Sequence, residues 1–417
     1  MRSAERPRFQ RIRHARNAKA NRVRFAFQRS LGKRLMAERE KKEPLQYPLR
    51  QLYFYLTGGC NLRCRHCWIA PTFEEKDHSA RSLDPGLFRS IIAQAKPLGL
   101  TSVKLTGGEP LIHPDIEGIL DHIRQEGLHL TVETNGTRCT PQLAAKLHAC
   151  NTAFVSVSLD GSDAETHEWI RGVPGCFDAA LEGVKNLVDA GFHPQIIMTV
   201  MRRNQHQMES LVRLAESVGA GSVKFNLVQP TSRGERMHER GETLDVTRLV
   251  DLGRWVEQEL APRAGIKIFY SHPPAFRPMG RMFGDKGNGT GICGIFGILG
   301  VLGDGSYALC GIGESVEELV FGHAETDRLE QVWNHHPVLA EIREGLPAKL
   351  DGICSRCLMR SFCLGSCIAQ NYYRSKRLWA PFWYCEEAEK AGLFPETRLA
   401  PDRTGPTRNS SVCGLSG

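Results

Sequence analysis

The chain has 417 residues, of which 41% are hydrophobic and 24% charged, and this length and composition suit one large globular domain with a smaller second one. No apolar run reaches about 18 residues and no apolar segment follows the basic N-terminus, so the sequence argues against a membrane span and a secretory signal and predicts a cytoplasmic protein. The formal net charge of +8 comes from one end of the chain, because residues 1–42 hold 15 Lys or Arg against three Glu.

This basic end is the first predicted segment. We expect residues 1–45 to form a solvated N-terminal arm. The alternative is an arm that contacts nucleic acid or an acidic partner, and the scarcity of aromatic residues in it argues against nucleic acid.

From Leu52 onward, short β-rich runs alternate with longer amphipathic stretches. The predicted strands run from Leu52 to Thr57, Ser102 to Thr106, Leu130 to Thr134, Ala153 to Leu159, Gln195 to Met201 and Ser222 to Val228. The predicted helices run from Pro85 to Lys96, Asp115 to Glu126, Gln142 to Ala149, Phe177 to Ala190 and Met208 to Val218. Four glycines just past helical segments, where a left-handed cap suits glycine, mark their ends: Gly99, Gly127, Gly191 and Gly219.

Six strand–helix units predict an α/β fold with a parallel sheet and right-handed crossovers. Because six units fall short of eight, we expect a partial (βα)6 TIM-like barrel over residues 46–260, with an open sheet as the alternative. In either geometry the chemistry belongs at the carboxyl ends of the strands. Residues 261–394 are Gly- and Pro-rich and predict a small Cys-rich domain without a large apolar core. Residues 395–417 predict a disordered tail.

The 14 cysteines are many for a chain without an export signal. The reduced cytosol disfavours a disulfide framework, so metal or cluster binding is the better interpretation. Three of them, Cys60, Cys64 and Cys67, form a CxxxCxxC triplet on the loop that leaves the first predicted strand. Three thiolates at this spacing can hold three corners of a cubane cluster and leave one iron open to an outside ligand. The alternatives are a zinc site that lacks a fourth ligand, or buried reduced thiols.

The triplet after the first strand resembles the signature of the radical S-adenosylmethionine (radical SAM) superfamily, and the resemblance spans roughly Leu52 to Val228. It implies a 4Fe-4S cluster whose open iron binds S-adenosyl-L-methionine, with reductive cleavage to a 5'-deoxyadenosyl radical. One departure from the family pattern is His66, which stands before the last cysteine of the triplet where an aromatic residue is usual.

Further motifs follow the later strands. The turn that carries Gly107, Gly108 and Glu109 resembles the family's GGEP motif, which holds the methionine amine; an ordinary strand-to-helix turn is the alternative. Ser158 and Arg171 belong to a pattern, S-x-D-G…H-x-x-x-R, that resembles the subgroup acting on peptides and proteins, and it implies contacts to the cofactor's ribose or carboxylate. The alternative is that Asp160 caps a helix and Arg171 is solvated. Asn135 lies in a turn that matches a weaker family feature.

The later cysteines reproduce the seven-cysteine pattern of the SPASM domain, which implies two auxiliary iron-sulfur clusters. The resemblance assigns one cluster to Cys293, Cys310 and Cys367. It assigns the other to four residues: Cys354, Cys357, Cys363 and Cys385. The first cluster lacks a visible fourth thiolate, because no cysteine follows Cys293 within six residues. Zinc in place of iron is the alternative for this domain. The remaining cysteines fit neither pattern: Cys139, Cys150, Cys176 and Cys413.

The resemblance to SPASM-containing enzymes implies a ribosomally made peptide or protein as the substrate, which is cross-linked, epimerised or oxidised. It also implies an electron donor such as ferredoxin or flavodoxin. The enzymatic alternative is a small molecule or tetrapyrrole, as in haem biosynthesis, and the non-enzymatic one is a zinc-binding scaffold. Only 59 residues precede Cys60, so we expect no fused leader-recognition module. Recognition of a leader would then need a separate leader-binding protein or the basic arm. The sequence identifies no catalytic acid or base.

Overall fold

The computed structural model describes residues 47–74, 81–150, 153–284 and 293–401. The predicted basic arm and most of the predicted C-terminal tail lie outside these residues. No helix in the described part is both long and apolar enough to cross a membrane.

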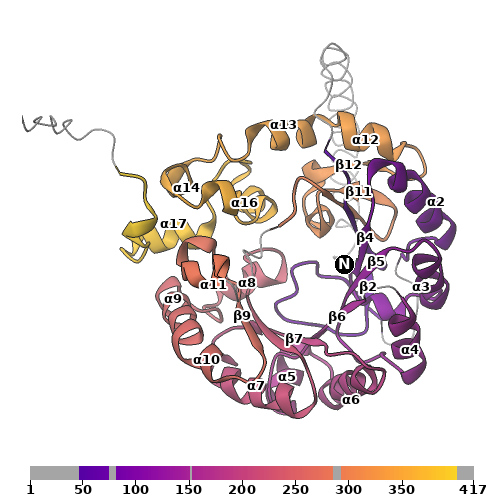
Figure 1. Cartoon of the computed structure of the whole chain (residues 1–417), viewed down its shortest axis with the longest axis horizontal. Helices are drawn as coiled ribbons and strands as arrows, with labels where there is room; N and C mark the ends of the chain where they lie inside the picture. Colours follow the sequence, from indigo (N-terminus) through magenta and orange to yellow (C-terminus); the bar gives the residue numbers. More distant parts are fainter. Residues whose placement is uncertain (1–46, 75–80, 151–152, 285–292, 402–417) are drawn as a thin grey trace, which may run out of the picture.

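One mixed sheet organises the described part of the chain, in the order β12-β11-β10-β1-β4-β5-β6-β7-β8-β9 (Figure 1). Its strands are β1 (Gln51–Tyr55), β4 (Ser102–Thr106), β5 (His129–Thr134), β6 (Phe154–Ser158), β7 (Gln195–Val200), β8 (Ser222–Leu227), β9 (Lys267–Tyr270), β10 (Ile298–Val301), β11 (Ser306–Ala308) and β12 (Val320–His323). Neighbours from β10 through β1 to β9 pair in parallel, whereas β11 and β12 join in antiparallel fashion. All six predicted strands are present, and the predicted fold class is confirmed.

The longer helices line the outside of the curved sheet (Figure 1). They are α2 (Pro85–Ala95), α3 (Ile116–Gln125), α4 (Pro141–Ala149), α6 (Cys176–Asp189), α7 (Met208–Ser217) and α9 (Val246–Trp255). Local sequence sets their ends: the Asp84 side chain accepts a hydrogen bond from Leu87 N at 2.8 Å at the start of α2, and Thr140 caps α4 in the same way. The four predicted cap glycines all adopt positive φ, from 67° to 104°.

Alternate side chains of each parallel strand face opposite sides of the sheet. Leu52 and Phe54 of β1 are fully buried toward the helices, where the Phe54 ring lies 4.5 Å from the Phe88 ring of α2. Tyr53, between them, therefore faces the inside of the barrel. Burying these outward residues is worth roughly 25 cal/mol per Å² of apolar surface removed from water, which fixes the register of the whole wall.

The sheet continues past residue 260, where the predicted barrel domain ends. β9 pairs with β8, and β10 pairs with β1, where Gln51 lies opposite Ile298. The later helices α12 (Leu329–His335), α13 (Pro337–Gly345), α14 (Gly352–Arg356), α16 (Ile368–Ser375) and α17 (Trp383–Lys390) form an arc between the two ends of the sheet (Figure 1). In this arc α12 packs on α2 and α17 packs on α9. The boundary of the Cys-rich domain stays a prediction. The chain after residue 260 adds strands to both ends of the same sheet.

Two expectations for the C-terminal region differ from the structure. Residues 261–394 contribute to an extensive apolar core, since Trp333 and Tyr384 are almost completely buried in the cluster that includes Phe54. Aromatic side chains supply much of the buried apolar area in this region, and its high Gly and Pro content gave no indication of this. Residues 395–401 also do not fit a disordered tail. Leu358 N donates to Arg398 O and Ala400 N donates to Arg356 O, both at 2.8 Å, so this stretch is hydrogen-bonded to the chain around α14.

Candidate functional site

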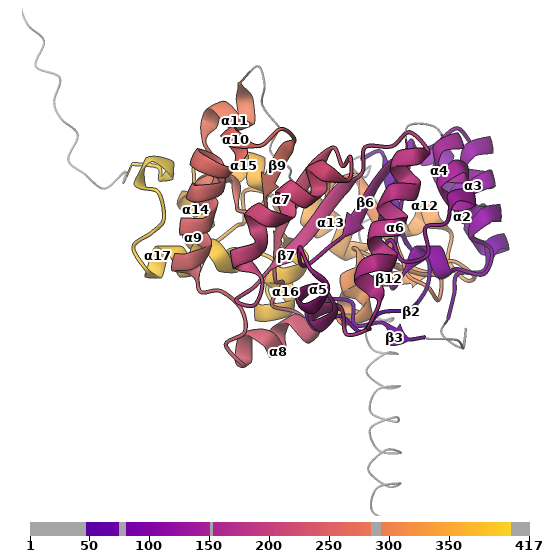
Figure 2. The ribbon, with the colours of Figure 1, turned by 90° about the horizontal axis from the view of Figure 1, so that it is seen from below.

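The loop that carries Cys60, Cys64 and Cys67 is docked on the end of helix α5 (Ala164–Arg171). Arg63 N donates to Arg171 O and Arg65 N donates to Ile170 O, each at 2.9 Å. Cys60 lies in the two-residue strand β2 (Gly59–Cys60), which pairs with β3 (Thr72–Phe73). Figure 2 shows β2, β3, α5 and α8 (Arg233–Glu239) at the same end of the barrel. Backbone contacts therefore hold the thiol-bearing loop from two sides.

The three thiols of this loop lie close enough to influence one another. Burial raises the pKa of Cys64 to about 11, and the nearby Cys67 adds to this while the Arg171 guanidinium opposes it. Burial likewise raises the pKa of Cys60, with Cys64 and Cys67 contributing. Three mutually close sulfurs, two of them on buried cysteines, are the donor set that a cluster iron accepts, because cysteine binds a cluster as the thiolate. The residues present fit the predicted cluster.

The turn with Gly107 and Gly108 presses its backbone against the loop of the cysteine triplet. Gly108 N donates to Thr57 O and Glu109 N to Gly59 O, both at 3.0 Å. A Cβ on Gly108 would overlap the carbonyl oxygen of Gly59, and Gly107 adopts φ +125°. Glycine is required at both positions for this approach. The GGEP turn and the triplet are thus brought together as predicted from the strand order.

Glu109 is 1% exposed and holds the third strand-end turn in place. Its carboxylate accepts hydrogen bonds from Thr134 Oγ1 at 2.6 Å, Asn135 N at 2.7 Å and Leu111 N at 3.0 Å. The Asn135 side chain in turn donates to Asn61 Oδ1 at 2.9 Å, next to Cys60. Burial raises the pKa of Glu109 although these hydrogen bonds favour its ionised form. Sequence reasoning expected an ammonium partner for this carboxylate and missed its partners within the protein.

A buried ion pair joins the fourth strand end to the cysteine loop. Arg171 Nε lies 2.8 Å from Asp160 Oδ2, and Arg171 Nη1 donates to Cys64 Sγ at 3.5 Å. Asp160 is 0% exposed and Arg171 7% exposed. Burial alone would raise the pKa of Asp160, but the Arg171 guanidinium helps to hold it below its ordinary value. The alternative of a solvated Arg171 is wrong, and the residue that caps α5 is Asp163, which accepts from Thr166 N at 2.8 Å.

His66 completes this group from the cysteine loop. Its Nε2 lies 3.6 Å from Asp160 Oδ2, and burial lowers its pKa to about 4, so the ring is neutral near pH 7. Asp160 also accepts from Thr199 N at 2.8 Å through its other carboxylate oxygen. Ser158, at the end of β6, is half-buried and makes no side-chain hydrogen bond within the described residues. The motif spacing identified Ser158, Asp160 and Arg171 as candidate site residues but did not predict the hydrogen bonds and ion pairs that Asp160 and Arg171 form.

A second set of thiols lies beside the barrel wall. Cys310 follows β11 and Cys367 precedes α16, and burial raises the pKa of Cys310, with Cys367 and Cys293 adding to the effect. Cys293 and Cys310 also raise the pKa of Tyr53 on β1, beyond the larger effect of burial. The three cysteines assigned to one auxiliary cluster are therefore brought together next to the inward face of β1.

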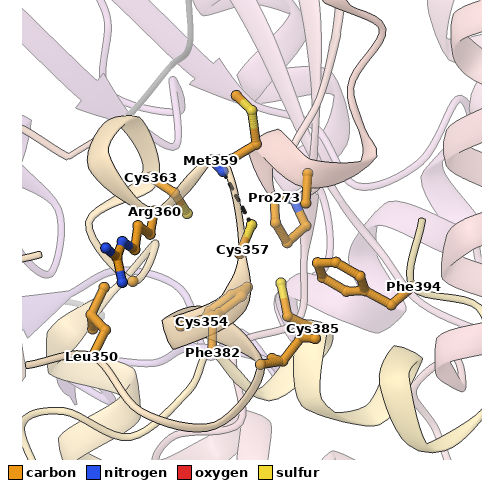
Figure 3. Close-up of a pocket in the computed structure, with 13 residues that line it drawn as sticks. Pro273, Leu350, Cys354, Cys357, Met359, Arg360, Cys363, Phe382, Cys385 and Phe394 are labelled. Carbon is orange, nitrogen blue, oxygen red and sulfur yellow. Dashed lines mark hydrogen bonds between the residues drawn. The ribbon is translucent and has the colours of Figure 1, made fainter. Parts of the chain in front are cut away.

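The other four cysteines line one apolar cavity (Figure 3). They come from three short helices and the turns between them: Cys354 from α14, Cys357 from the following turn, Cys363 from α15 (Arg360–Cys363) and Cys385 from α17. Phe382 and Phe394 form part of the same lining. Burial raises the pKa of Cys354 to about 11 and that of Cys363 to about 12. Four thiols around an apolar cavity are a donor set that fits a four-iron cluster.

Among the described residues, no three His, Cys, Asp or Glu side chains converge on one metal-ion position.

The other cysteines that sequence reasoning left aside occupy different places. Cys176 is buried in contact with the cysteine-triplet group, Cys139 and Cys150 lie in the main core, and Cys413 lies outside the described residues. Sequence spacing gave no signal for the proximity of Cys176.

Comparisons with known proteins agree with this arrangement. The Radical SAM superfamily model matches residues 54–215. An AdoMet-dependent heme synthase of Methanosarcina barkeri is 30% identical over 341 residues, which cover 78% of this chain and 92% of that protein. A mycofactocin maturase, MftC, of Mycolicibacterium smegmatis is 28% identical over 361 residues, covering 85% and 87%. The chain belongs to the radical SAM superfamily, and this membership implies a 4Fe-4S cluster and S-adenosylmethionine as cofactors.

Solved structures share the fold. Streptococcus suis SuiB bound to S-adenosylmethionine aligns with TM-score 0.64 at 19% identity, covering 84% of this chain and 80% of that one. Native anSMEcpe with bound AdoMet aligns with TM-score 0.62 at 16% identity, covering 82% and 95%. Both alignments extend well beyond the region that the family model matches. The predicted membership and fold are confirmed.

Proposed function

We propose that this radical SAM enzyme modifies a side chain of a ribosomally made peptide or protein. The observation that carries the proposal is the placement of two sets of cysteine thiols around one barrel. The Cys60 triplet lies at the carboxyl ends of the strands, and the set with Cys293 and Cys310 lies beside Tyr53 on the inner wall. A substrate inside the barrel would face both. The maturase name of the MftC relatives, and the structure of SuiB bound to its precursor peptide SuiA, support a peptide as this substrate.

The proposal assigns roles to residues of this chain. Cys60, Cys64 and Cys67 hold the cluster that, with S-adenosylmethionine, supplies the 5'-deoxyadenosyl radical. The cofactor-binding residues are Gly107, Gly108, Glu109, Asn135, Ser158 and Arg171. The hydrogen bonds from Gly108 N and Glu109 N fix this turn against the loop of the cysteine triplet, beside the proposed cluster. Asp160 orients Arg171, and the buried surroundings of both exclude water from the site.

The two remaining thiol sets are assigned to auxiliary iron-sulfur clusters. Cys293, Cys310 and Cys367 hold one, whereas the cavity of Figure 3 holds the other through its four cysteines. The first set leaves one iron free for another side chain or for the substrate. A ferredoxin or flavodoxin as electron donor, a separate leader-binding protein and a cytoplasmic location stay predictions.

The test is an anaerobic reaction of the reconstituted protein with reductant and S-adenosylmethionine. One arm contains short peptides encoded beside its gene, and the other contains an iron porphyrin with carboxylate side chains. We expect 5'-deoxyadenosine together with a changed peptide mass; a loss of two hydrogens indicates a cross-link, and solvent deuterium without net change indicates epimerisation. The Cys64→Ala variant controls for reaction without the cluster.

The heme synthase relative, which aligns at 30% identity, favours a second candidate function on a tetrapyrrole. Conversion of the porphyrin with unchanged peptides would replace the peptide proposal with this one. If wild-type protein with a full iron complement yields no 5'-deoxyadenosine in either arm, both candidates fail.

A further inference from the structure

The inner wall of the barrel carries charged side chains where a closed TIM barrel is filled with branched apolar ones. Lys104 of β4, Glu133 of β5 and Lys224 of β8 occupy strand positions whose neighbours are fully buried toward the helices. These outward neighbours are Val103, Leu105, Val132, Val223 and Phe225. By the alternation of strand side chains, the three charged residues face the barrel interior with Tyr53. We call Lys104, Glu133 and Lys224 the inner-wall triad.

Two of the three charges neutralise each other. Lys104 Nζ lies 2.6 Å from Glu133 Oε1 and 4.9 Å from the centre of the Tyr53 ring. Burial raises the pKa of Glu133, but the Lys104 ammonium and, more weakly, the Lys224 ammonium hold it below its ordinary value. Glu133 is therefore ionised near neutral pH, and the triad as a whole carries one excess positive charge.

That excess charge resides on Lys224. Its ammonium is half-buried and makes neither an ion pair nor a hydrogen bond with any described residue. Taking an ammonium out of water without a partner is costly, and such a group gains by binding an anion. Glu133 does not act as the anionic partner of Lys224, because its carboxylate already pairs with Lys104 at hydrogen-bonding distance.

The triad lies between the two groups of thiols. Across the sheet, Lys224 pairs with Ile197 and Ile197 with Ser158, the predicted cofactor contact at the end of β6. On the other side, the charge of Lys104 acts on both Cys293 and Cys310. A ligand held by the triad would therefore sit on the inner wall, level with Ser158 and next to the first auxiliary thiol set.

We propose that the inner-wall triad binds a carboxylate of the substrate, with Lys224 as its direct partner and the Lys104–Glu133 pair holding the neighbouring wall in place. This rests on the proposed function for the peptide, whose carboxylate is either its C-terminus or an acidic side chain. A carboxylate accepts the charge-assisted hydrogen bonds that an unpaired ammonium offers. The triad thus selects substrates that present an anionic group to the inside of the barrel, and Lys224 is a specificity-determining residue.

The first experiment needs no substrate. Crystals of anaerobically purified holoenzyme are grown in sodium bromide, and anomalous diffraction locates the bound anions. We expect bromide within hydrogen-bonding distance of Lys224 Nζ, and its displacement when acetate is added. The Lys224→Met variant should lose this peak, whereas Lys267→Met, which changes an exposed lysine at the start of β9, should keep it. Bromide elsewhere on the protein but absent from the triad overturns the proposal, and the wild-type crystal alone decides this if Lys224→Met does not fold.

The second experiment uses the peptide that wild-type enzyme modifies, in three forms: unaltered, C-terminally amidated, and with its acidic side chains replaced by amides. A charge-assisted hydrogen bond is worth about 1.5 to 3 kcal/mol, so removing the relevant carboxylate should raise KM about 10- to 100-fold. Lys224→Met should raise KM similarly for the unaltered peptide and change it little for the form that lacks that carboxylate. Equal KM values for all three forms overturn the carboxylate site. If wild type modifies no peptide, the proposed function fails while the bromide result still tests the triad.

Discussion

The Arg171–Asp160 pair ties helix α5, strand β6 and the loop of the cysteine triplet into one unit, and its removal should be costly. Its 2.8 Å contact lies between a carboxylate that is 0% exposed and a guanidinium 7% exposed. Removing one partner leaves a buried charge unpaired, which typically costs 3 to 5 kcal/mol, and we therefore expect about 4 kcal/mol for Arg171→Met. Asp160→Asn should cost a comparable amount, although its amide oxygen can still accept from Thr199 N.

A double-mutant cycle separates the pair from its surroundings. In the double variant neither charge remains, so the loss should fall at least about 2 kcal/mol below the sum of the single losses. The assay is guanidinium denaturation of the reduced, metal-free protein under anaerobic conditions, followed by circular dichroism. The control is Arg213→Met, which breaks an exposed 2.9 Å pair with Glu209 on one helix and should cost less than about 1 kcal/mol. Additive losses, or an Arg171→Met loss no larger than that of the control, would refute the reasoning.

Three further outcomes follow from the site and the core. Gly108→Ala forces the GGEP turn away from the facing loop, so we expect loss of roughly four irons per chain, whereas Gly280→Ala, which has open space, should keep them; equal iron contents would contradict this close approach. Cys354→Ala should lower iron from roughly ten to twelve per chain by up to about four, while Cys150→Ala leaves it unchanged; an unaltered iron content in the first variant would remove Cys354 from the ligands. Burial lowers the pKa of His336 to about 4, so the folded protein favours the neutral ring. The free energy of unfolding should therefore be highest above about pH 6.5 and fall by about 3 kcal/mol as the pH drops toward 4. Denaturation of metal-free protein at several pH values should show a flatter dependence of the unfolding free energy on pH in His336→Phe than in wild type. The same pH dependence in both proteins would contradict this role of His336.

Much of the barrel follows from local pattern. The six predicted strands have β-rich apolar runs, and glycines such as Gly99 and Gly127 mark helix ends because their backbone adopts positive φ. β9 and β10 were missed because each has four residues in a Gly- and Pro-rich region and its partner lies far away in sequence. Periodicity in so short a segment does not identify a strand, and pairing with β8 or β1 is a tertiary choice.

The candidate site divides in the same way. Spacing alone brought out the cysteine sets, and the strand order placed the GGEP turn against the first of them. The partners of buried charges could not be predicted, because Asp160 and Arg171 come from different elements whose packing decides their contact. Lys224 gave no motif signal at all. A single lysine in a strand gains meaning only when its neighbours across the barrel are known.

The parallel pairing of β10 with β1 has a consequence for how the chain reaches its native state. Until residues near Ile298 are available, β1 presents an unsatisfied row of backbone amides and carbonyls along one side. Strand pairs so distant in sequence form slowly, because a long loop must close first. A fragment that stops at residue 260 should therefore self-associate rather than behave as an independent catalytic module, and the cysteine-rich region acts during folding as the piece that shields it.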